Sequence, residues 1–295
     1  NRCAPMAFGP VFAPTGHRRR IAAGRKITQY MSGLIIESSR TGDIRLLFED
    51  DRYLIVSKPA GLLVHRTPLD AYEPENLKDL LKPHIAGRID PVHRLDKPTS
   101  GVIVFGKDAE AINACKAQFE ARKTDKSYLA VVRGHVDHEG CIGKPLPKGI
   151  TGPPKLSRTS YASVATCDLP YPVTRYESAR LSLVQCEPHT GRYHQIRLHF
   201  RHFRHPIIGD SQHGDKHQNR AFTEFTGLSG LLLHARSFAF DHVEGGRLHL
   251  TAAVPPSWNA LDLHAKWNLE PYRTESALHS PNPRLPGQSP EDSAP

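Results

Sequence analysis

Short apolar runs separated by polar turns recur along the chain and predict β-strands. The runs Arg45–Phe48 and Tyr53–Ser57 flank the polar segment 49–52, which predicts a β-hairpin. Two longer, partly alternating runs, Thr159–Thr166 and Thr174–Gln185, predict a second antiparallel pair. Further strands are predicted at Val102–Phe105, Tyr128–Val132, Leu231–Phe240 and Arg247–Val254.

Helical patterns are fewer than strand patterns. Asp108 stands in a position suited to the N-cap of a helix over Ala109–Arg122, whose apolar residues keep helical spacing. The segment Arg192–Phe203 fits a second helix. Many strands with few helices predict an α+β fold, built on a large, mixed but mostly antiparallel β-sheet that is flanked by helices and loops.

The two ends of the chain differ in composition from its middle. The first 43 residues open with an arginine-rich stretch, free of acids over residues 1–30, that carries much of the net charge of +9. Such a stretch is typical of a targeting peptide or a nucleic-acid-binding arm. Residues 269–295 are rich in proline and serine and bury too little apolar surface to offset the entropy of ordering. We therefore predict a catalytic domain over 44–268, between a disordered basic extension over 1–43 and a disordered tail.

The cysteines and the apolar runs restrict the class of protein. Five cysteines stand far apart, which argues against a disulfide scaffold and a CxxC zinc site and favours a reducing compartment, the cytoplasm. A membrane helix needs about twenty consecutive apolar residues, and no apolar run approaches that length. We expect no contact with a membrane, and nothing in the sequence indicates an obligatory protein partner.

The segment Pro91–Gly101 is the first of three polar clusters, and it places Asp96 two residues after Arg94 in a Pro/Thr/Ser/Gly loop. A carboxylate there is a candidate reactive group, kept ionised by nearby positive charge. The alternative is an aspartate that caps a turn or pairs with Arg94 at the surface. A protein kinase loop is excluded, because Leu95 separates Arg94 from Asp96 and no Gly-rich phosphate loop precedes them.

The second cluster interleaves arginine and histidine with aromatic residues over 190–205 and continues to residue 220. This composition suits phosphate contacts and base stacking, although a solvated helical face with a few core aromatics would show the same pattern. The candidate RNA-binding residues are Arg192, His194, Arg201, Arg204, Lys216 and Arg220.

The third cluster, residues 205–215, is rich in histidine and aspartate. Its composition is compatible with a metal-dependent phosphoesterase. Its Pro and Gly residues force loops, however, and metal-binding histidines on a helix usually stand four residues apart. The alternative is a tight structural loop whose Asp and His side chains bond its own backbone.

Taken together, these strings resemble the RluA-type pseudouridine synthases. The signature His-Arg-Leu-Asp-x-x-Thr-Ser-Gly matches residues 93–101, Gly-Arg-x-His-Gln-Ile/Leu-Arg-x-His matches 191–199, and His-Pro-Ile-x-Gly-Asp matches 205–210. Blocks at 58–61, 126–128 and 233–235 fit the same family, so the resemblance spans roughly residues 45–255 in the right order. It implies the pseudouridine synthase catalytic fold, with a central cleft.

Within the family, the likeness is greatest to the TruC branch, which modifies uridine 65 of certain tRNAs. Segments 61–66, 171–176 and 205–220 look like that branch. Gln195 and Leu198 follow the general family pattern instead, which keeps ribosomal RNA open as an alternative target. A more remote alternative is an RNA-binding protein without catalytic activity.

The resemblance also implies a role for each matched position. Asp96 would be the catalytic aspartate, Arg94 would fill the space left by the flipped uridine, and Tyr128 would lie against the target base. Arg197 would pair with Asp96 and keep it ionised, and Leu233 would be an apolar neighbour in the pocket. The reaction oxidises nothing and transfers no phosphate, so no cofactor and no metal are expected. The partner is an RNA substrate, most directly tRNA.

Overall fold

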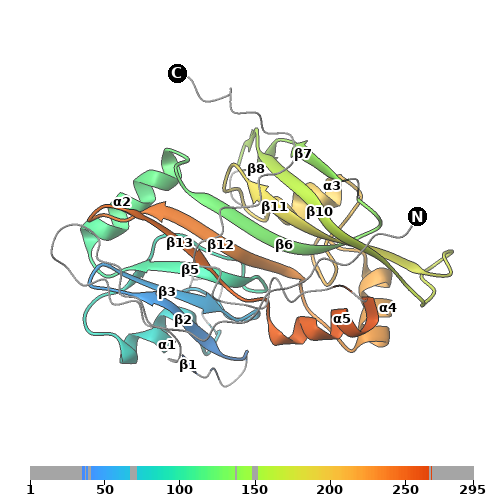
Figure 1. Ribbon diagram of the computed structural model, residues 1–295, viewed down its shortest axis with the longest axis horizontal. Coiled ribbons are helices and arrows are strands. Elements are labelled where there is room, and N and C mark those ends of the chain that lie inside the picture. Colours follow the sequence, from blue (N-terminus) through green and yellow to red (C-terminus); the bar gives the residue numbers. More distant parts are fainter. Residues whose placement is uncertain are drawn as a thin grey trace, which may run out of the picture.

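Eleven strands join into one twisted, mixed sheet in the computed structural model, which describes residues 35–36, 38, 41–66, 72–136, 138–147, 152–265 and 267 (Figure 1). The main path of the sheet runs β1-β2-β3-β5-β12-β6-β11-β10-β7, while β13 pairs with β12 and β4 pairs with β5. Among the pairings described, β5 with β12 is parallel and the others are antiparallel. The predicted α+β fold with a mostly antiparallel sheet is confirmed.

The strands of this sheet are β1 (Ile35–Ile36), β2 (Ile44–Glu49), β3 (Tyr53–Lys58), β4 (Asp90–Pro91), β5 (Ser100–Gly106), β6 (Asp125–Arg133), β7 (Glu139–Gly143), β10 (Arg158–Leu169), β11 (Ala179–Pro188), β12 (Leu233–Asp241) and β13 (Arg247–Thr251). A separate pair consists of β8 (Leu146–Pro147) and β9 (Pro154–Lys155). The α-helices are α1 (Leu77–Leu81), α2 (Ala109–Glu120), α3 (Gln195–His202), α4 (Lys216–Thr226) and α5 (Asn259–Ala265), and short 3₁₀ turns cover Lys82–His84 and Pro256–Trp258.

Several elements agree with the sequence pattern. The β2–β3 hairpin is present, and the Asp108 carboxylate accepts from the backbone N–H of Ala111 at the start of α2. Some predicted starts are wrong, and for two of them the backbone gives the reason. The strand expected from Thr174 begins at Ala179, because Thr174 has a φ of 52° inside a tight turn that closes between Val173 and Tyr176.

The helix expected from Arg192 is the second correction. It begins at Gln195, because the preceding residue, His194, has a left-handed backbone with φ of 49°. Helices α1, α4 and α5 were not predicted, although Asp215 caps the start of α4 and Gly227, with φ of 71°, ends it.

The predicted domain boundary at residue 44 falls just inside the described structure. Ile35 and Ile36 form β1 and pair with β2, upstream of that boundary. Most of the predicted extension and all of the predicted tail lie outside the described residues. Among the described residues, no helix is long and apolar enough to cross a membrane.

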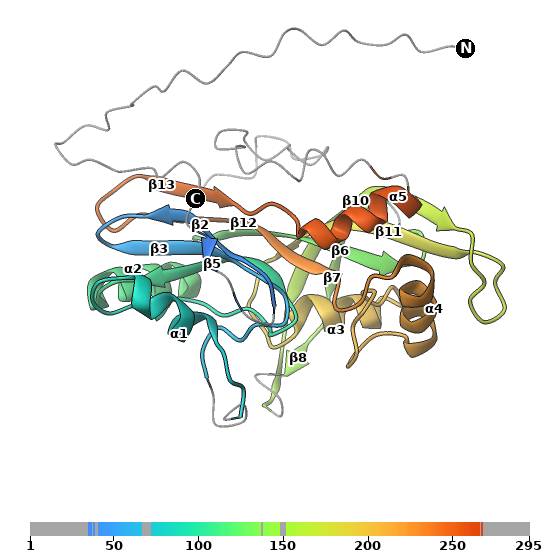
Figure 2. The same ribbon diagram turned by 90° about the horizontal axis from the view of Figure 1, so that it is seen from below.

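Successive residues of the central strands point to opposite faces of the sheet, and both faces are buried. On β6, Leu129 and Val131 join a cluster with α4 and α5, whereas Ala130 and Val132 join a cluster with α3. Figure 2 shows α1, α3 and β8 on one side of the sheet and α5 on the other. On the α1/α3 side, Tyr128 packs against both the cluster under α1 and the cluster under α3.

The parallel pairing of β5 with β12 brings two backbones unusually close. Gly101 pairs with Ala235, has a φ of 113°, and would place a Cβ only 2.1 Å from the Ala235 carbonyl oxygen. Because no side chain fits there, glycine is required at this position. The loop that carries Asp96 leads directly into this contact and is therefore anchored at the centre of the sheet.

Candidate active site

The Asp96 loop connects β4 to β5 and is held by its own backbone. Thr99 N–H donates to the Asp96 carbonyl oxygen at 3.0 Å, and Gly61 N–H donates to the Lys97 carbonyl oxygen at 2.9 Å. His93 anchors the start of the loop, since its Nε2 accepts from Val104 N–H and its ring stacks on Phe238. These contacts leave the Asp96 side chain free to point away from the loop.

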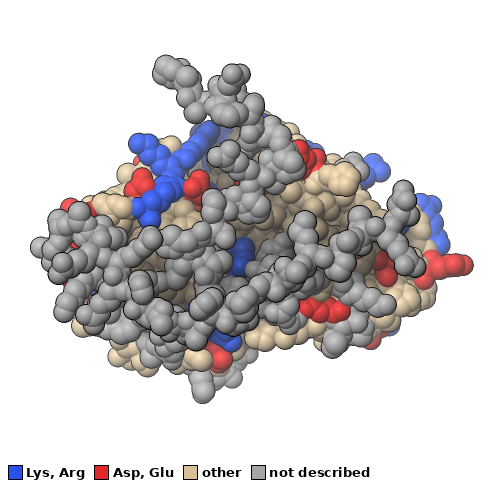
Figure 3. Space-filling view, in the orientation of Figure 1, with Lys and Arg blue, Asp and Glu red and all other residues tan. Residues whose placement is uncertain are grey.

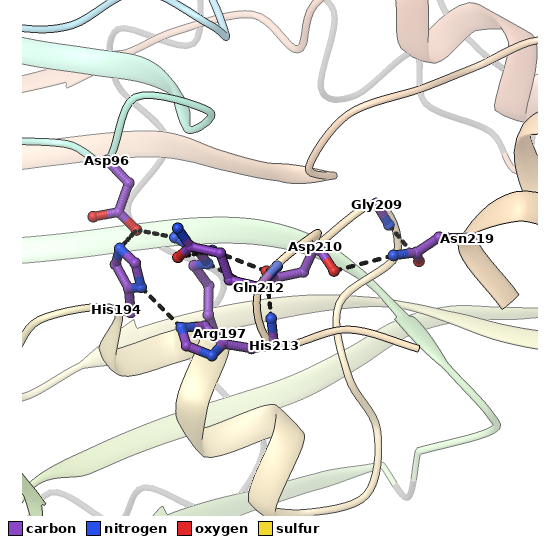
Figure 4. Close-up of polar contacts among 8 residues, drawn as sticks. All are labelled: Asp96, His194, Arg197, Gly209, Asp210, Gln212, His213 and Asn219. Carbon is purple, nitrogen blue, oxygen red and sulfur yellow. Dashed lines mark hydrogen bonds and ion pairs between the residues drawn. The ribbon is translucent and has the colours of Figure 1, made fainter. Parts of the chain in front are cut away.

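Arg197 lies next to Asp96, as the resemblance implied. Its Nη1 donates to Oδ2 of Asp96 at 3.1 Å, and the side chain of Arg197 is 3% exposed whereas that of Asp96 is 24% exposed. The same guanidinium donates from Nε and Nη2 to the two carboxylate oxygens of Asp210, each at 2.8 Å (Figure 4). A forked contact of this kind fixes both the position and the plane of the guanidinium.

Asp210 organises the loop that follows α3. Besides Arg197, its Oδ1 accepts the backbone N–H groups of Gln212 at 3.0 Å and His213 at 2.9 Å. Burial alone would raise the pKa of Asp210, but Arg197 and these N–H groups hold the pKa below its ordinary value. Asp210 is therefore a buried anion fully engaged within the protein, and Asp96 is the carboxylate with a face toward solvent.

In the third polar cluster, Asp210 bonds the backbone of its own loop, as that alternative expects, whereas the rings of His205 and His213 contact Arg133 and His194 outside the loop. Among the described residues, no group of three or more His, Cys, Asp and Glu side chains is placed to hold a metal ion. The metal-dependent phosphoesterase considered from composition has no ligand cluster in this part of the chain.

Tyr128 lies on β6, half-buried between the two clusters of the α1/α3 side. Burial, and after it the negative charge of Asp96, raise the pKa of the Tyr128 hydroxyl above its usual range. Tyr128 is therefore neutral at pH 7 and close enough to feel the charge of Asp96. Leu233 is buried on β12, two residues before Ala235, the residue that pairs with Tyr128.

Arg94 has no hydrogen-bond or ion-pair partner within the described part of the chain, and its side chain is exposed. Its charge contributes to a lowered pKa of His65, after the larger effect of burial, which places the guanidinium near that ring. The structure thus brings Asp96, Tyr128 and Arg197 together, and leaves Arg94 as a free cation two residues from the carboxylate.

Lys58 is a buried cation behind the Asp96 loop. Its Nζ donates to the carbonyl oxygens of Pro59 at 2.9 Å, Leu62 at 2.8 Å and Lys97 at 3.1 Å. Burial lowers the pKa of Lys58 to about 7, and the charge of Asp96 opposes that shift. Three carbonyl acceptors match the three N–H donors of an ammonium group, so Lys58 ties the Asp96 loop to the segment after β3.

Comparison with known proteins gives this arrangement a family. The profile described as RNA pseudouridylate synthase matches residues 52–202. A protein of Pasteurella multocida named tRNA pseudouridine synthase C is 40% identical over 237 residues, which cover 77% of this chain and 98% of that protein. The protein of the same name in Haemophilus influenzae is 39% identical, with 76% and 98% covered.

The chain belongs to the RNA pseudouridylate synthase family.

This membership confirms the resemblance to RluA-type pseudouridine synthases and the expected isomerase activity on RNA. Solved structures agree on the fold. Human RNA pseudouridylate synthase domain containing 1 superposes with a TM-score of 0.59 at 22% identity, over 76% of this chain and 87% of that one. Human RNA pseudouridylate synthase domain containing 4 gives a TM-score of 0.58, also at 22% identity, over 74% and 92%.

The six candidate RNA-binding residues fall into two groups. Arg201, Arg204, Lys216 and Arg220 are exposed on α3, α4 and the loop between them, and Arg192 is partly exposed. Arg201 and Arg204 have no acidic partner among the described residues, whereas Arg220 pairs with Glu224 at 2.8 Å. His194 differs from this group, because it is buried and its Nε2 lies 3.7 Å from Oδ2 of Asp96.

On the opposite face, Arg247 is an example of a cation that is already paired with acids. Figure 3 shows the side of the sheet that carries α5, where Lys and Arg side chains near the end of α2 lie among Asp and Glu side chains. Arg247, which donates to the Lys123 carbonyl oxygen just after α2, pairs with both Asp125 and Asp241. Arg201 stands on the same helix as Arg197, one turn from it and on the same side, and Arg204 lies just after the end of this helix.

Sequence reasoning missed the partners that hold the pseudouridine synthase site in place. Asp210 and Gln212 contact Arg197, His213 contacts His194, and Lys58 holds the Asp96 loop. The signal for Asp210 was the match at 205–210, where the aspartate was considered as a metal ligand or a backbone acceptor. Its forked contact with Arg197 was not predicted.

Proposed function

We propose that this protein isomerises a uridine of tRNA, uridine 65, to pseudouridine, with Asp96 as the catalytic carboxylate. The observation that carries the proposal is the contrast between the two carboxylates on Arg197. Asp210 is buried and spends its oxygens inside the protein, whereas Asp96 receives a single N–H from Arg197 and stays partly exposed. The tRNA target is supported by relatives named tRNA pseudouridine synthase C, which this chain covers almost end to end.

The chemistry needs an anion at the sugar. The bond between N1 of the base and C1′ of ribose breaks, a bond between C5 and C1′ forms, and one proton moves from C5 to N1. Asp96 acts at the sugar as nucleophile or as base, and both roles require the ionised carboxylate. Arg197, protonated at all working pH values, supplies a fixed positive charge beside it.

The target base must leave its helix to reach this carboxylate. Extruding a base costs a few kcal/mol of unstacking. The exposed Arg94 guanidinium would enter the gap, and the neutral Tyr128 ring would face the extruded base. Arg201, Arg204 and Lys216 would bind phosphates around the site, which makes binding salt-dependent. An RNA substrate also supports the cytoplasmic location expected from the sequence.

A role for Gln195 in choosing ribosomal RNA is not supported by its position. Gln195 is 5% exposed, and its amide Nε2 donates to the Arg158 carbonyl oxygen at 2.9 Å and to Thr159 Oγ1 at 3.0 Å. It joins α3 to β10 and does not reach the surface where RNA would bind. This residue therefore carries no information on the RNA target.

The test is incubation with unmodified tRNA, followed by mapping of carbodiimide-dependent reverse-transcription stops. We expect one new stop at uridine 65, no stop with Asp96→Asn, none on a transcript with cytidine at that position, and an unchanged rate in EDTA. Ribosomal RNA is treated in parallel. A stop on ribosomal RNA alone would move the target, and no stop on any RNA would leave a non-catalytic RNA-binding protein.

A further inference from the structure

His194 lies next to Asp96, and His213 contacts the far side of the His194 ring. His194 Nε2 lies 3.7 Å from Asp96 Oδ2, and the other ring nitrogen, Nδ1, lies 2.9 Å from His213 Nε2 (Figure 4). Neither histidine was assigned a role beside the carboxylate by the sequence motifs.

The His194 side chain is directed at Asp96 by an unusual backbone. Its φ of 49° and ψ of 32° are left-handed, a conformation that non-glycine residues adopt rarely and at a cost in free energy. His194 precedes α3, yet its side chain makes no capping bond to that helix. The ring instead stacks on Tyr193, with centroids 3.7 Å apart and planes 20° from parallel. The ring plane is thus fixed while one nitrogen faces Asp96.

His213 is placed by the same aspartate that places Arg197. Its backbone N–H donates to Asp210 Oδ1 at 2.9 Å, and the N–H of the next residue, Gly214, donates to the Asp210 carbonyl oxygen at 3.0 Å. A Cβ on Gly214 would lie 2.2 Å from that oxygen, so the turn requires glycine. One buried carboxylate therefore sets the position of both the guanidinium and the second histidine.

A hydrogen bond between two neutral imidazoles requires a proton on one nitrogen and a lone pair on the other. Burial is the main reason that the pKa of His194 falls to about 4 and that the pKa of His213 is also lowered, so both rings are neutral at pH 7. If His194 donated from Nδ1, its Nε2 lone pair would face the negative Asp96. If His213 donates from Nε2, His194 carries its proton on Nε2 and presents an N–H to Asp96.

We propose that His213 is a positioning residue that holds the proton of His194 on Nε2, so that His194 presents a neutral N–H to Oδ2 of the catalytic Asp96. This inference rests on the proposed function of Asp96. Arg197 Nη1 and His194 Nε2 both address Oδ2, and Figure 4 shows the other oxygen of Asp96 pointing away from them. Oδ1 of Asp96 would then face the sugar, and we expect the 3.7 Å separation between His194 Nε2 and Oδ2 to shorten to a hydrogen bond when substrate binds.

The tautomer can be read directly in the full-length protein without RNA. In a long-range proton–nitrogen correlation spectrum of protein labelled with ¹⁵N-histidine, the two ring nitrogens of His194 are assigned by loss of their signals in His194→Gln. We expect Nε2 to be protonated and Nδ1 to be bare in the wild type. In His213→Leu, both tautomers of His194 should be populated. His213→Gln should restore the tautomer with the proton on Nε2, because the glutamine amide still donates to Nδ1 of His194.

Turnover of tRNA gives the second measurement. His213→Leu should lower kcat about tenfold, the effect of one lost hydrogen bond, with KM unchanged. His213→Gln should recover most of that loss. The matched control is His84→Leu, an exposed histidine without a hydrogen-bond or ion-pair partner in the described structure, for which tautomer and kcat should stay as in the wild type.

A proton on Nδ1 of His194 in the wild type would overturn the inference, and so would an unchanged tautomer in His213→Leu. Equal kcat values for His213→Leu and wild type would do the same. If the wild-type protein forms no pseudouridine, the proposed function fails, but the tautomer result stands apart from it because no RNA is present in that measurement.

Discussion

Arg197 is buried and Asp96 is not, although the two side chains meet at 3.1 Å across 101 residues of chain. The cation is therefore shielded from solvent behind the anion, and a substrate that approaches from outside meets the carboxylate first. An exposed pair of the same residues would be screened and would bind weakly. This asymmetry fits the proposed roles, in which Asp96 reacts and Arg197 supports it, and it leads to the predictions that follow.

Asp96→Asn removes the anion and keeps the shape. We expect kcat to fall by about 10³-fold or more, because the group that acts at the sugar is gone. The free energy of unfolding should change by about 1 kcal/mol or less, since the side chain is partly exposed and has a single partner from Arg197. Carbodiimide mapping measures the first quantity and urea unfolding the second. A variant that fails to fold would show that Asp96 is structural.

Arg197→Lys keeps the positive charge and loses the paired hydrogen bonds of the guanidinium to Asp210. A single ammonium group cannot copy the paired contacts to Asp210 and also reach Asp96, so both kcat and thermal stability should fall. RNA affinity in a filter-binding assay should hold, because the net charge is the same. Wild-type turnover in this variant would remove the pairing role of Arg197.

Asp210→Asn removes the carboxylate that neutralises the buried Arg197 guanidinium. We expect a loss of about 3 kcal/mol in the free energy of unfolding, together with loss of turnover. Glu224→Gln is the matched control: it breaks the exposed pair with Arg220 and should leave the urea midpoint unchanged.

The contribution of Asp210 also has a pH dependence. The pKa of Asp210 in the folded protein is below its ordinary value of 3.8, so the stabilisation is complete above that value and disappears as the pH falls through the folded pKa. The difference in the free energy of unfolding between the wild type and Asp210→Asn should therefore become smaller as the pH is lowered below 3.8. If the difference in stability stayed constant down to pH 2, the ionised carboxylate of Asp210 would not be its cause.

Lys58→Met tests the buried ammonium group. The variant leaves one buried and two partly buried carbonyl oxygens without this donor. Its free energy of unfolding, measured with urea, should therefore fall by about 3 kcal/mol at pH 7. Burial lowers the pKa of Lys58 to about 7 from 10.5, so between these values the unfolded chain binds a proton that the folded protein does not. Wild-type stability relative to the variant should therefore rise with pH across this window.

Gly101→Ala tests the close approach of β5 and β12. The added Cβ would meet the Ala235 carbonyl oxygen at 2.1 Å, and the φ of 113° disfavours any side chain, so the loss should exceed about 2 kcal/mol. Gly143→Ala on β7 is the control, because nothing lies within 4 Å of its added Cβ, and its effect should stay within about 0.5 kcal/mol. Equal melting temperatures for the two variants would contradict this explanation.

Local patterns in the sequence predicted the elements that depend on near neighbours. The β2–β3 hairpin and the Asp108 cap of α2 involve residues that are close along the chain, and both are present. The predicted start of α3 was wrong, because residue type does not reveal that the backbone of His194 is left-handed. The ring of His194 contacts Asp96 and His213, which the local pattern does not contain.

The contacts that build the site depend on distant parts of the chain. The family motifs located Asp96, Tyr128 and Arg197, and the pairing of Asp96 with Arg197 was expected from that resemblance. Position along the chain gives no sign that Asp210 would take two of the guanidinium nitrogens or that a histidine pair would stand behind Asp96. These arrangements follow from the folded sheet and the loop after α3.

The position of β12 has a consequence for how the protein is made. This strand lies between β5 and β6, yet it is one of the last to leave the ribosome. Until it is inserted, β6 presents an open edge to other chains, β5 has no partner for Ser100 and Gly101 on the edge that it shares with β4, and the Asp96 loop lacks the backbone that Gly101 packs against. Synthesis must therefore reach the far end of the domain before the enzyme can acquire activity, and a chain stalled before residue 233 would offer the open edge of β6 to aggregation.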